Sequence, residues 1–128
     1  MARVLVVDDE EAIRFTFHRF LTDAGHEVSL AAHENDAREI FSRNEFDVAV
    51  IDRTLSDGDT GMVLMKEIKN LQLSCEVIMM SGYPIFSDSS KAEEDESFTY
   101  LTKPIRGSEI VQYVEEAAKE SMLNEEAS

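Results

Sequence analysis

Cysteine, basic residues and long apolar runs are scarce in this 128-residue chain, and each scarcity excludes a class of protein. The one cysteine, Cys75, cannot form an intrachain disulfide. The N-terminus turns acidic too early for a signal peptide, so we expect a cytoplasmic protein. No apolar stretch approaches the roughly 20 residues that span a bilayer. Only 12 Lys and Arg stand against 27 Asp and Glu, a net charge of −15, which disfavours direct binding to nucleic acid and to anionic membranes.

The length of the chain allows one sizeable core and is too short for two. With 43% apolar and 30% charged residues, its composition is that of a globular domain. Five apolar runs predict strands at 3–7, 27–31, 47–51, 76–80 and 98–102. The first, third and fourth runs are nearly continuous in Val, Ile, Leu and Met, which is typical of parallel strands buried on both faces.

Segments with helical spacing separate these strands. Apolar residues recur at steps of three and four in 10–24, 34–43 and 61–71, and again after Ser108. Gly25 is a candidate C-terminal cap and Ser108 a candidate N-cap. The alternation of strands and helices predicts an α/β fold, a doubly wound five-stranded parallel sheet with helices on both faces.

One connecting segment, 85–97, lacks the apolar stripe of a packed helix. After Phe86 its only apolar residue is Ala92, and four consecutive acidic residues at 93–96 repel one another. Two interpretations stay open: a short, poorly anchored helix or loop, or a segment near an order–disorder balance that a partner or modification shifts.

Polar side chains follow four of the predicted strands at their carboxyl ends. In chain order they are Asp8 and Asp9, with Glu10 next to them, then Asp52, Ser81 and Lys103. In a doubly wound sheet these ends meet at one edge, where functional residues collect. Three carboxylates so close together repel unless a cation lies among them, and a set of oxygen ligands favours Mg²⁺. A metal, a lysine and a hydroxyl can receive phosphoryl oxygens, and a carboxylate can attack phosphorus to form an aspartyl phosphate.

Four motifs carry a resemblance to a known family: "VLVVDDEEAIR", "DVAVIDRTLSDGDTG", "VIMMSGYP" and "YLTKPI". Together they resemble the receiver domain of two-component response regulators, from residue 3 to about residue 120. The resemblance implies a flavodoxin-like sheet of order 2-1-3-4-5. We therefore expect a receiver domain over 1–120. The C-terminal tail 121–128 is expected to be frayed or to start a linker.

The resemblance further assigns a role to each site residue. Asp52 becomes the phosphoacceptor, Lys103 the phosphate-binding lysine, and Ser81 and Tyr100 the switch pair. The implied Mg²⁺ ligands are Asp8, Asp9, Asp52 and the backbone carbonyl of Thr54. Pro104 is expected to follow a cis peptide bond. Thr54 and Tyr83 are expected to flank the phosphoryl group, and our hypothesis is that the bulky Tyr83 hinders the attacking water and prolongs the phosphate lifetime.

The expected function is therefore a phosphoprotein of a two-component system or phosphorelay. A histidine kinase or phosphotransfer protein would supply the phosphoryl group in a Mg²⁺-dependent reaction. The face made by the fourth helix, fifth strand and fifth helix would then signal to an effector protein or domain. We expect no enzyme activity beyond self-directed phosphotransfer and autodephosphorylation. The chain could act alone or as the N-terminal piece of a longer regulator.

Two alternatives come from other functional classes. One is a receiver-like interaction module that is never phosphorylated, against which the complete set of site residues argues. The other is a Mg²⁺-dependent phosphatase, but such enzymes usually carry an acid two residues after the nucleophile, where this chain has Thr54. Ser56, in place of the family's usual Pro, and one extra residue in "DGDTG" predict altered loop geometry without loss of a proposed catalytic group.

Overall fold

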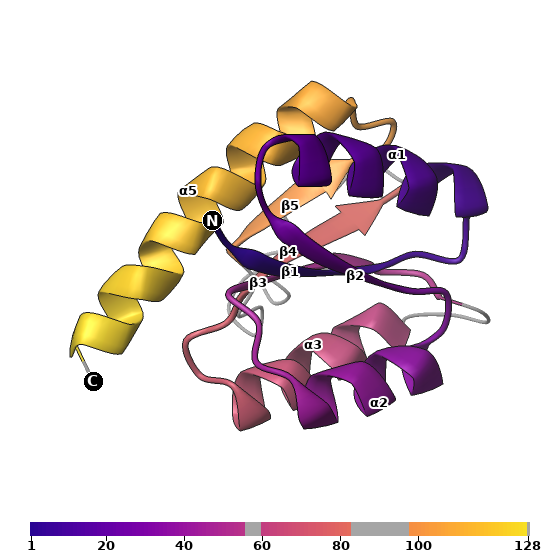
Figure 1. Cartoon of the computed structure of the whole chain (residues 1–128). Helices are drawn as coiled ribbons and strands as arrows, with labels where there is room; N and C mark the ends of the chain where they lie inside the picture. The colour runs from indigo at the N-terminus through magenta and orange to yellow at the C-terminus, as the bar shows by residue number, and fades with distance from the viewer. Residues whose placement is uncertain (56–59, 83–97, 128) are drawn as a thin grey trace.

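The predicted strands form one parallel sheet in the order β2-β1-β3-β4-β5 (Figure 1). A computed structural model describes residues 1–55, 60–82 and 98–127. Its elements are β1 Arg3–Val7, α1 Glu11–Asp23, β2 Glu27–Ala31, α2 Glu34–Arg43, β3 Val48–Asp52, α3 Thr60–Leu71, β4 Glu76–Ser81, β5 Thr99–Thr102 and α5 Gly107–Ala127. The fold class and the strand order are confirmed, and each predicted strand lies within one residue of its expected bounds.

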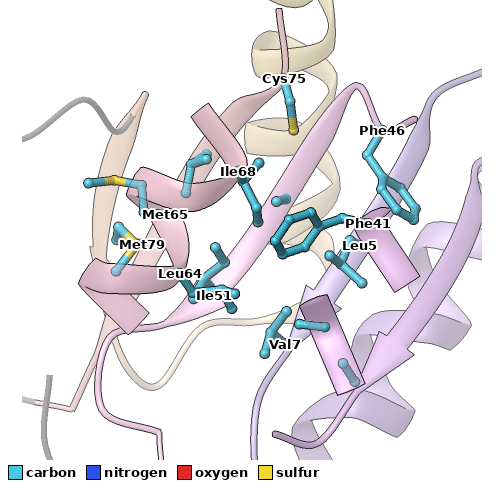
Figure 2. Packing of buried hydrophobic residues seen from close by; sticks show 14 of the residues in the cluster. Leu5, Val7, Phe41, Phe46, Ile51, Leu64, Met65, Ile68, Cys75 and Met79 are labelled. Carbon is cyan, nitrogen blue, oxygen red and sulfur yellow. The ribbon is translucent and has the colours of Figure 1, made fainter. Parts of the chain in front are cut away.

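The sheet separates two layers of helices, with α1 and α5 on one face and α2 and α3 on the other (Figure 1). Side chains of alternate residues in the central strands point to opposite faces of the sheet. Leu5 and Val7 join the cluster under α2 and α3, part of which Figure 2 shows, whereas Val4 and Val6 join the cluster under α1 and α5. Because β1, β3 and β4 are covered on both faces, their runs are almost continuously apolar, as the sequence indicated.

The helix ends confirm one predicted cap and correct another. Gly25 follows α1 with φ of 94°, and its N–H donates to the Thr22 carbonyl at 2.9 Å, as expected of a glycine that ends a helix. Ser108 is not the N-cap of α5, because that helix already begins at Gly107. Instead, the Glu109 carboxylate accepts the backbone N–H of Arg106 at 3.1 Å, which is one half of a capping box.

Helix α5 is longer than the sequence indicated. It continues through the segment 121–127, which was expected to be a frayed tail or the start of a linker. Asn124 contributes to this order, because its side-chain amide donates to the buried carboxylate of Glu76 at 2.7 Å. The placement of the domain boundary at residue 120 stays a prediction.

Some of the expectations lie outside the described residues. They are the two interpretations of 85–97, the role of Tyr83, and the loop changes at Ser56 and after it. Within the described ranges, no helix has both the length and the apolar character needed to cross a membrane.

Gly61, at the start of α3, is where a helix approaches the backbone at the end of β3 most closely. Its N–H donates to the Arg53 carbonyl at 3.0 Å. A β-carbon added to Gly61 would lie 2.7 Å from the Arg53 Cα and would also collide with the carbonyl oxygen of Asp52. The absence of a side chain at Gly61 therefore lets α3 begin directly against the chain that carries Asp52.

We predict that Gly61→Ala destabilises the fold by about 1–3 kcal/mol, because the methyl group meets backbone atoms that cannot rotate away. Urea denaturation of both proteins measures the change. Gly82→Ala is the matched control, since a β-carbon at Gly82 meets nothing within 4 Å and should change stability by less than about 1 kcal/mol. Equal effects of the two substitutions would contradict the close approach.

Candidate functional site

The carboxyl ends of β1, β3, β4 and β5 bring the predicted site residues to one edge of the sheet. In the strand register Asp52 lies beside Met80, and Ser81 beside Thr102. Backbone hydrogen bonds extend past the strand ends, from Arg53 N–H to the Met80 carbonyl at 2.8 Å and from Lys103 N–H to the Ser81 carbonyl at 2.7 Å. The peptide bond between Lys103 and Pro104 is cis, as expected. The loops that bear the site are therefore fixed by the sheet itself.

The Lys103 ammonium contacts three carboxylates at this edge of the sheet. Its Nζ lies 2.8 Å from Asp8 Oδ2, 3.2 Å from Asp52 Oδ2 and 3.4 Å from Glu10 Oε1. The side chains are 14% exposed for Lys103, 0% for Asp8 and 7% for Asp52. One cation thus joins the ends of β1 and β3 in a place that is largely shielded from solvent, where charge interactions are stronger than at a surface.

Burial sets the proton affinities of this cluster. It raises the pKa of Asp8 and of Asp52 above the ordinary 3.8, although Lys103 and backbone N–H groups act in the opposite direction. For Lys103, burial lowers the pKa, but the hydrogen bonds and charges of Asp8 and Asp52 outweigh it and bring the pKa above 10.5. Removing Asp8 and Asp52 from water therefore disfavours their ionised forms by more than Lys103 and the backbone N–H groups favour them.

Three carboxylates beside Lys103 form a candidate site for a second cation. Carboxylate oxygens of Asp8, Asp9 and Glu10 lie within 4.8 Å of one another, and Asp9 and Glu10 are exposed. The donor set contains only oxygen, which suits a hard ion that keeps several of its waters. The buried Asp8 is already oriented, because its Oδ1 accepts the Glu10 N–H at 2.8 Å. Glu10, which was not among the predicted ligands, belongs to this group of carboxylates.

The remaining predicted residues lie around the same edge. Asp52 Oδ1 accepts the N–H of the exposed Thr54 at 3.1 Å, which orients the carboxylate. Ser81 is buried at the end of β4. Tyr100 is half-buried in β5, and its hydroxyl donates to the Met62 sulfur at 3.2 Å. The structure thus brings Asp8, Asp52 and Lys103 into direct contact; the metal, lifetime and switch roles stay predictions.

Two residues near the site were missed at the sequence level. Arg14 donates from Nη1 to the backbone carbonyl of Asp8 at 2.7 Å, which holds the turn between β1 and α1. Its position four residues after Glu10 could have suggested this, because one helical turn returns its side chain to the strand end. Met62 gives no such signal, since it reaches Tyr100 across 38 residues of chain.

We predict that Asp52→Asn raises the unfolding midpoint of the metal-free protein at pH 7 by roughly 2–5 °C. A raised carboxylate pKa means that the folded state prefers the neutral form, so ionisation costs stability above that pKa. Lys103 keeps Asp8 and Glu10 as partners. The advantage should vanish as pH falls through the raised pKa of Asp52 towards 3.8, where the parent's Asp52 becomes neutral too. Thermal unfolding at several pH values measures it, and a lower midpoint for the variant at pH 7 would contradict the account.

Comparison with known proteins places the chain in a family. The family model described as the response regulator receiver domain matches residues 4–115. Among curated proteins, the DNA-binding transcriptional regulator NtrC of Azospirillum brasilense is 31% identical over 91% of this chain and 24% of its own length. The virulence transcriptional regulatory protein PhoP of Salmonella typhimurium is 28% identical over 87% of this chain and 49% of its own. The chain thus spans a quarter to a half of these relatives. DNA binding is named for NtrC, so the expectation of no nucleic-acid binding here stays a prediction.

Solved structures agree with the family model. A CheY-like response regulator receiver domain from Methanospirillum hungatei superposes with a TM-score of 0.86 at 25% identity, covering 97% of this chain and 98% of that one. NtrX from Brucella abortus gives a TM-score of 0.85 at 28% identity, with 98% of this chain matched to 28% of NtrX. The extent of the family match and the shared topology lead to one conclusion: this chain belongs to the response regulator receiver domain family of two-component systems.

Proposed function

We propose that this receiver accepts a phosphoryl group on Asp52 from a histidine kinase or phosphotransfer protein, in a reaction that requires Mg²⁺. The observation that carries the proposal is the Lys103 ammonium, which is shared between the buried Asp8 and Asp52 beside a three-carboxylate group. A site with excess buried negative charge around one lysine is suited to take up a further cation together with a phosphoryl group.

The chemistry follows from the position of each group. An oxygen of the Asp52 carboxylate attacks phosphorus, the bond from phosphorus to the donor breaks, and an acyl phosphate forms. Asp8 and Asp9 would hold Mg²⁺, with Glu10 nearby. When bound, the metal would neutralise charge on the phosphoryl oxygens. The predicted ligands Asp52 and the Thr54 carbonyl would complete its coordination. Lys103, already within 3.2 Å of Asp52 Oδ2, exchanges part of that contact for a phosphoryl oxygen.

Phosphorylation would then act through the neighbouring strands. Strand β4 pairs with β3, and Asp52 lies opposite Met80, the residue before Ser81, so a phosphoryl group on Asp52 would have a hydroxyl on the next strand to attract. A shift of Ser81 towards it would favour an inward position of Tyr100 on β5. The phosphoryl group can move this equilibrium only by interacting differently with the two states.

A cavity of about 440 Å³ beside the site offers a route for the donor. It lies between α1 and the chain after β5, with Glu10, Ile13, Phe17, Lys103 and Ile105 in its lining. The net charge of −15 favours a partner with a basic surface. In this proposal the output is an effector protein or domain, and the chain turns over no separate substrate.

Incubation with acetyl phosphate tests the proposal, with intact mass as the readout. We expect one phosphoryl adduct on the parent chain in the presence of Mg²⁺, and none after chelation of the metal or in Asp52→Asn. The circular dichroism spectrum of each sample shows that it is folded. A folded parent that gains no adduct under any condition would instead favour the phosphorylation-independent interaction module.

The lifetime hypothesis has its own test. We expect the adduct on Tyr83→Ala to hydrolyse several-fold faster than on the parent, because a smaller side chain would admit water to the acyl phosphate. Loss of the adduct mass over time gives the rate. Phe15→Ala, which removes an exposed aromatic ring from α1, is the control and should leave the rate unchanged. An unchanged rate for Tyr83→Ala would remove Tyr83 from the site.

A further inference from the structure

Tyr100 is held by a residue from a different element. Its hydroxyl donates to the Met62 sulfur at 3.2 Å, and both side chains are partly buried against the cluster under α2 and α3. A thioether is a weak hydrogen-bond acceptor. This bond joins α3 to β5 while the Tyr100 ring lies against the core.

Met62 is also next to the backbone of the proposed phosphoacceptor. It follows Gly61, whose N–H donates to the Arg53 carbonyl at 3.0 Å and where an added β-carbon would collide with the Asp52 carbonyl oxygen. The first turn of α3 is therefore bonded to and packed against the end of β3, so Met62 lies one residue from a contact with the Asp52 backbone.

We propose that Met62 is a positioning residue that couples the phosphoacceptor strand to Tyr100. The coupling runs from Asp52 and Arg53 through Gly61 to the Met62 sulfur and the Tyr100 hydroxyl. It is separate from the route through Ser81 on β4. It stabilises the position in which the Tyr100 ring packs against the cluster under α2 and α3, which we take to be the position that favours phosphoryl binding. The inference deepens the proposed function, on which it rests.

The identity of the side chain matters for this role. Leucine has nearly the volume of methionine and would keep the packing at the start of α3. It offers no acceptor, so the Tyr100 hydroxyl would lose this partner while its ring remained against the core. Met62→Leu therefore removes the hydrogen bond and little else.

The test is a titration with beryllofluoride, a mimic of the phosphoryl group, in the presence of Mg²⁺ and followed by two-dimensional NMR. We expect Met62→Leu to weaken binding about two- to fivefold, the size of one weak hydrogen bond that favours the competent state. Tyr100→Phe removes the same bond and should weaken binding at least as much. In the double variant the two losses should therefore not multiply.

Met65→Leu is the matched control, since it is the same substitution one turn along α3 in the fully buried core; we expect it to leave the affinity within a factor of two of the parent. If Met62→Leu behaves like Met65→Leu, or if the losses of the two single variants multiply in the double variant, the coupling through Met62 is wrong while the phosphoacceptor function stands. If the folded parent itself does not bind beryllofluoride, the proposed function fails and this inference fails with it.

Discussion

The arrangement of this domain depends on one shared charge. The Lys103 ammonium lies within 3.4 Å of oxygens from Asp8, Glu10 and Asp52, so the ends of three strands meet at a single nitrogen. Coulombic attraction is strong in a site that is largely buried from solvent. However, the negative charge of three ionised carboxylates exceeds the positive charge of one ammonium. Burial is the main cause of the raised pKa values of Asp8 and Asp52, and repulsion from a neighbouring carboxylate adds to each. The proposed uptake of Mg²⁺ and of a phosphoryl group rests on this excess of carboxylates over cationic groups.

Much of the fold could be predicted from the sequence, because its determinants are local or periodic. Continuous apolar runs identified the buried strands, and steps of three and four identified α2 to the residue. The sheet edge also follows from chain order, since parallel strands bring Asp8, Asp52 and Lys103 to the same side. The sequence could therefore predict which residues meet at this edge of the sheet. The contacts of Lys103 with Asp8 and Asp52 confirm that prediction.

The details that escaped prediction depend on contacts between distant segments. Ser108 has the chemistry of an N-cap, yet Glu109 reaching back to Arg106 decides where α5 begins. The helical segment 121–127 is held by a hydrogen bond from Asn124 to Glu76, which lies 48 residues away in the chain. Glu10 reads as a helix-start residue, and only the position of Lys103 shows that it also faces the site. In each case a local preference was decided by a partner that local sequence does not reveal.

The attachment of α5 has a mechanical consequence. Its first residue, Gly107, lies so close to the Phe20 ring of α1 that a β-carbon would not fit there. Near its C-terminal end, Asn124 donates a hydrogen bond to Glu76 at the start of β4. These contacts at opposite ends of α5 disfavour a rotation of the whole helix about either end. A response of α5 to a change at Ser81, at the other end of β4, would therefore be a roll about the helix axis or a bend between the two contacts.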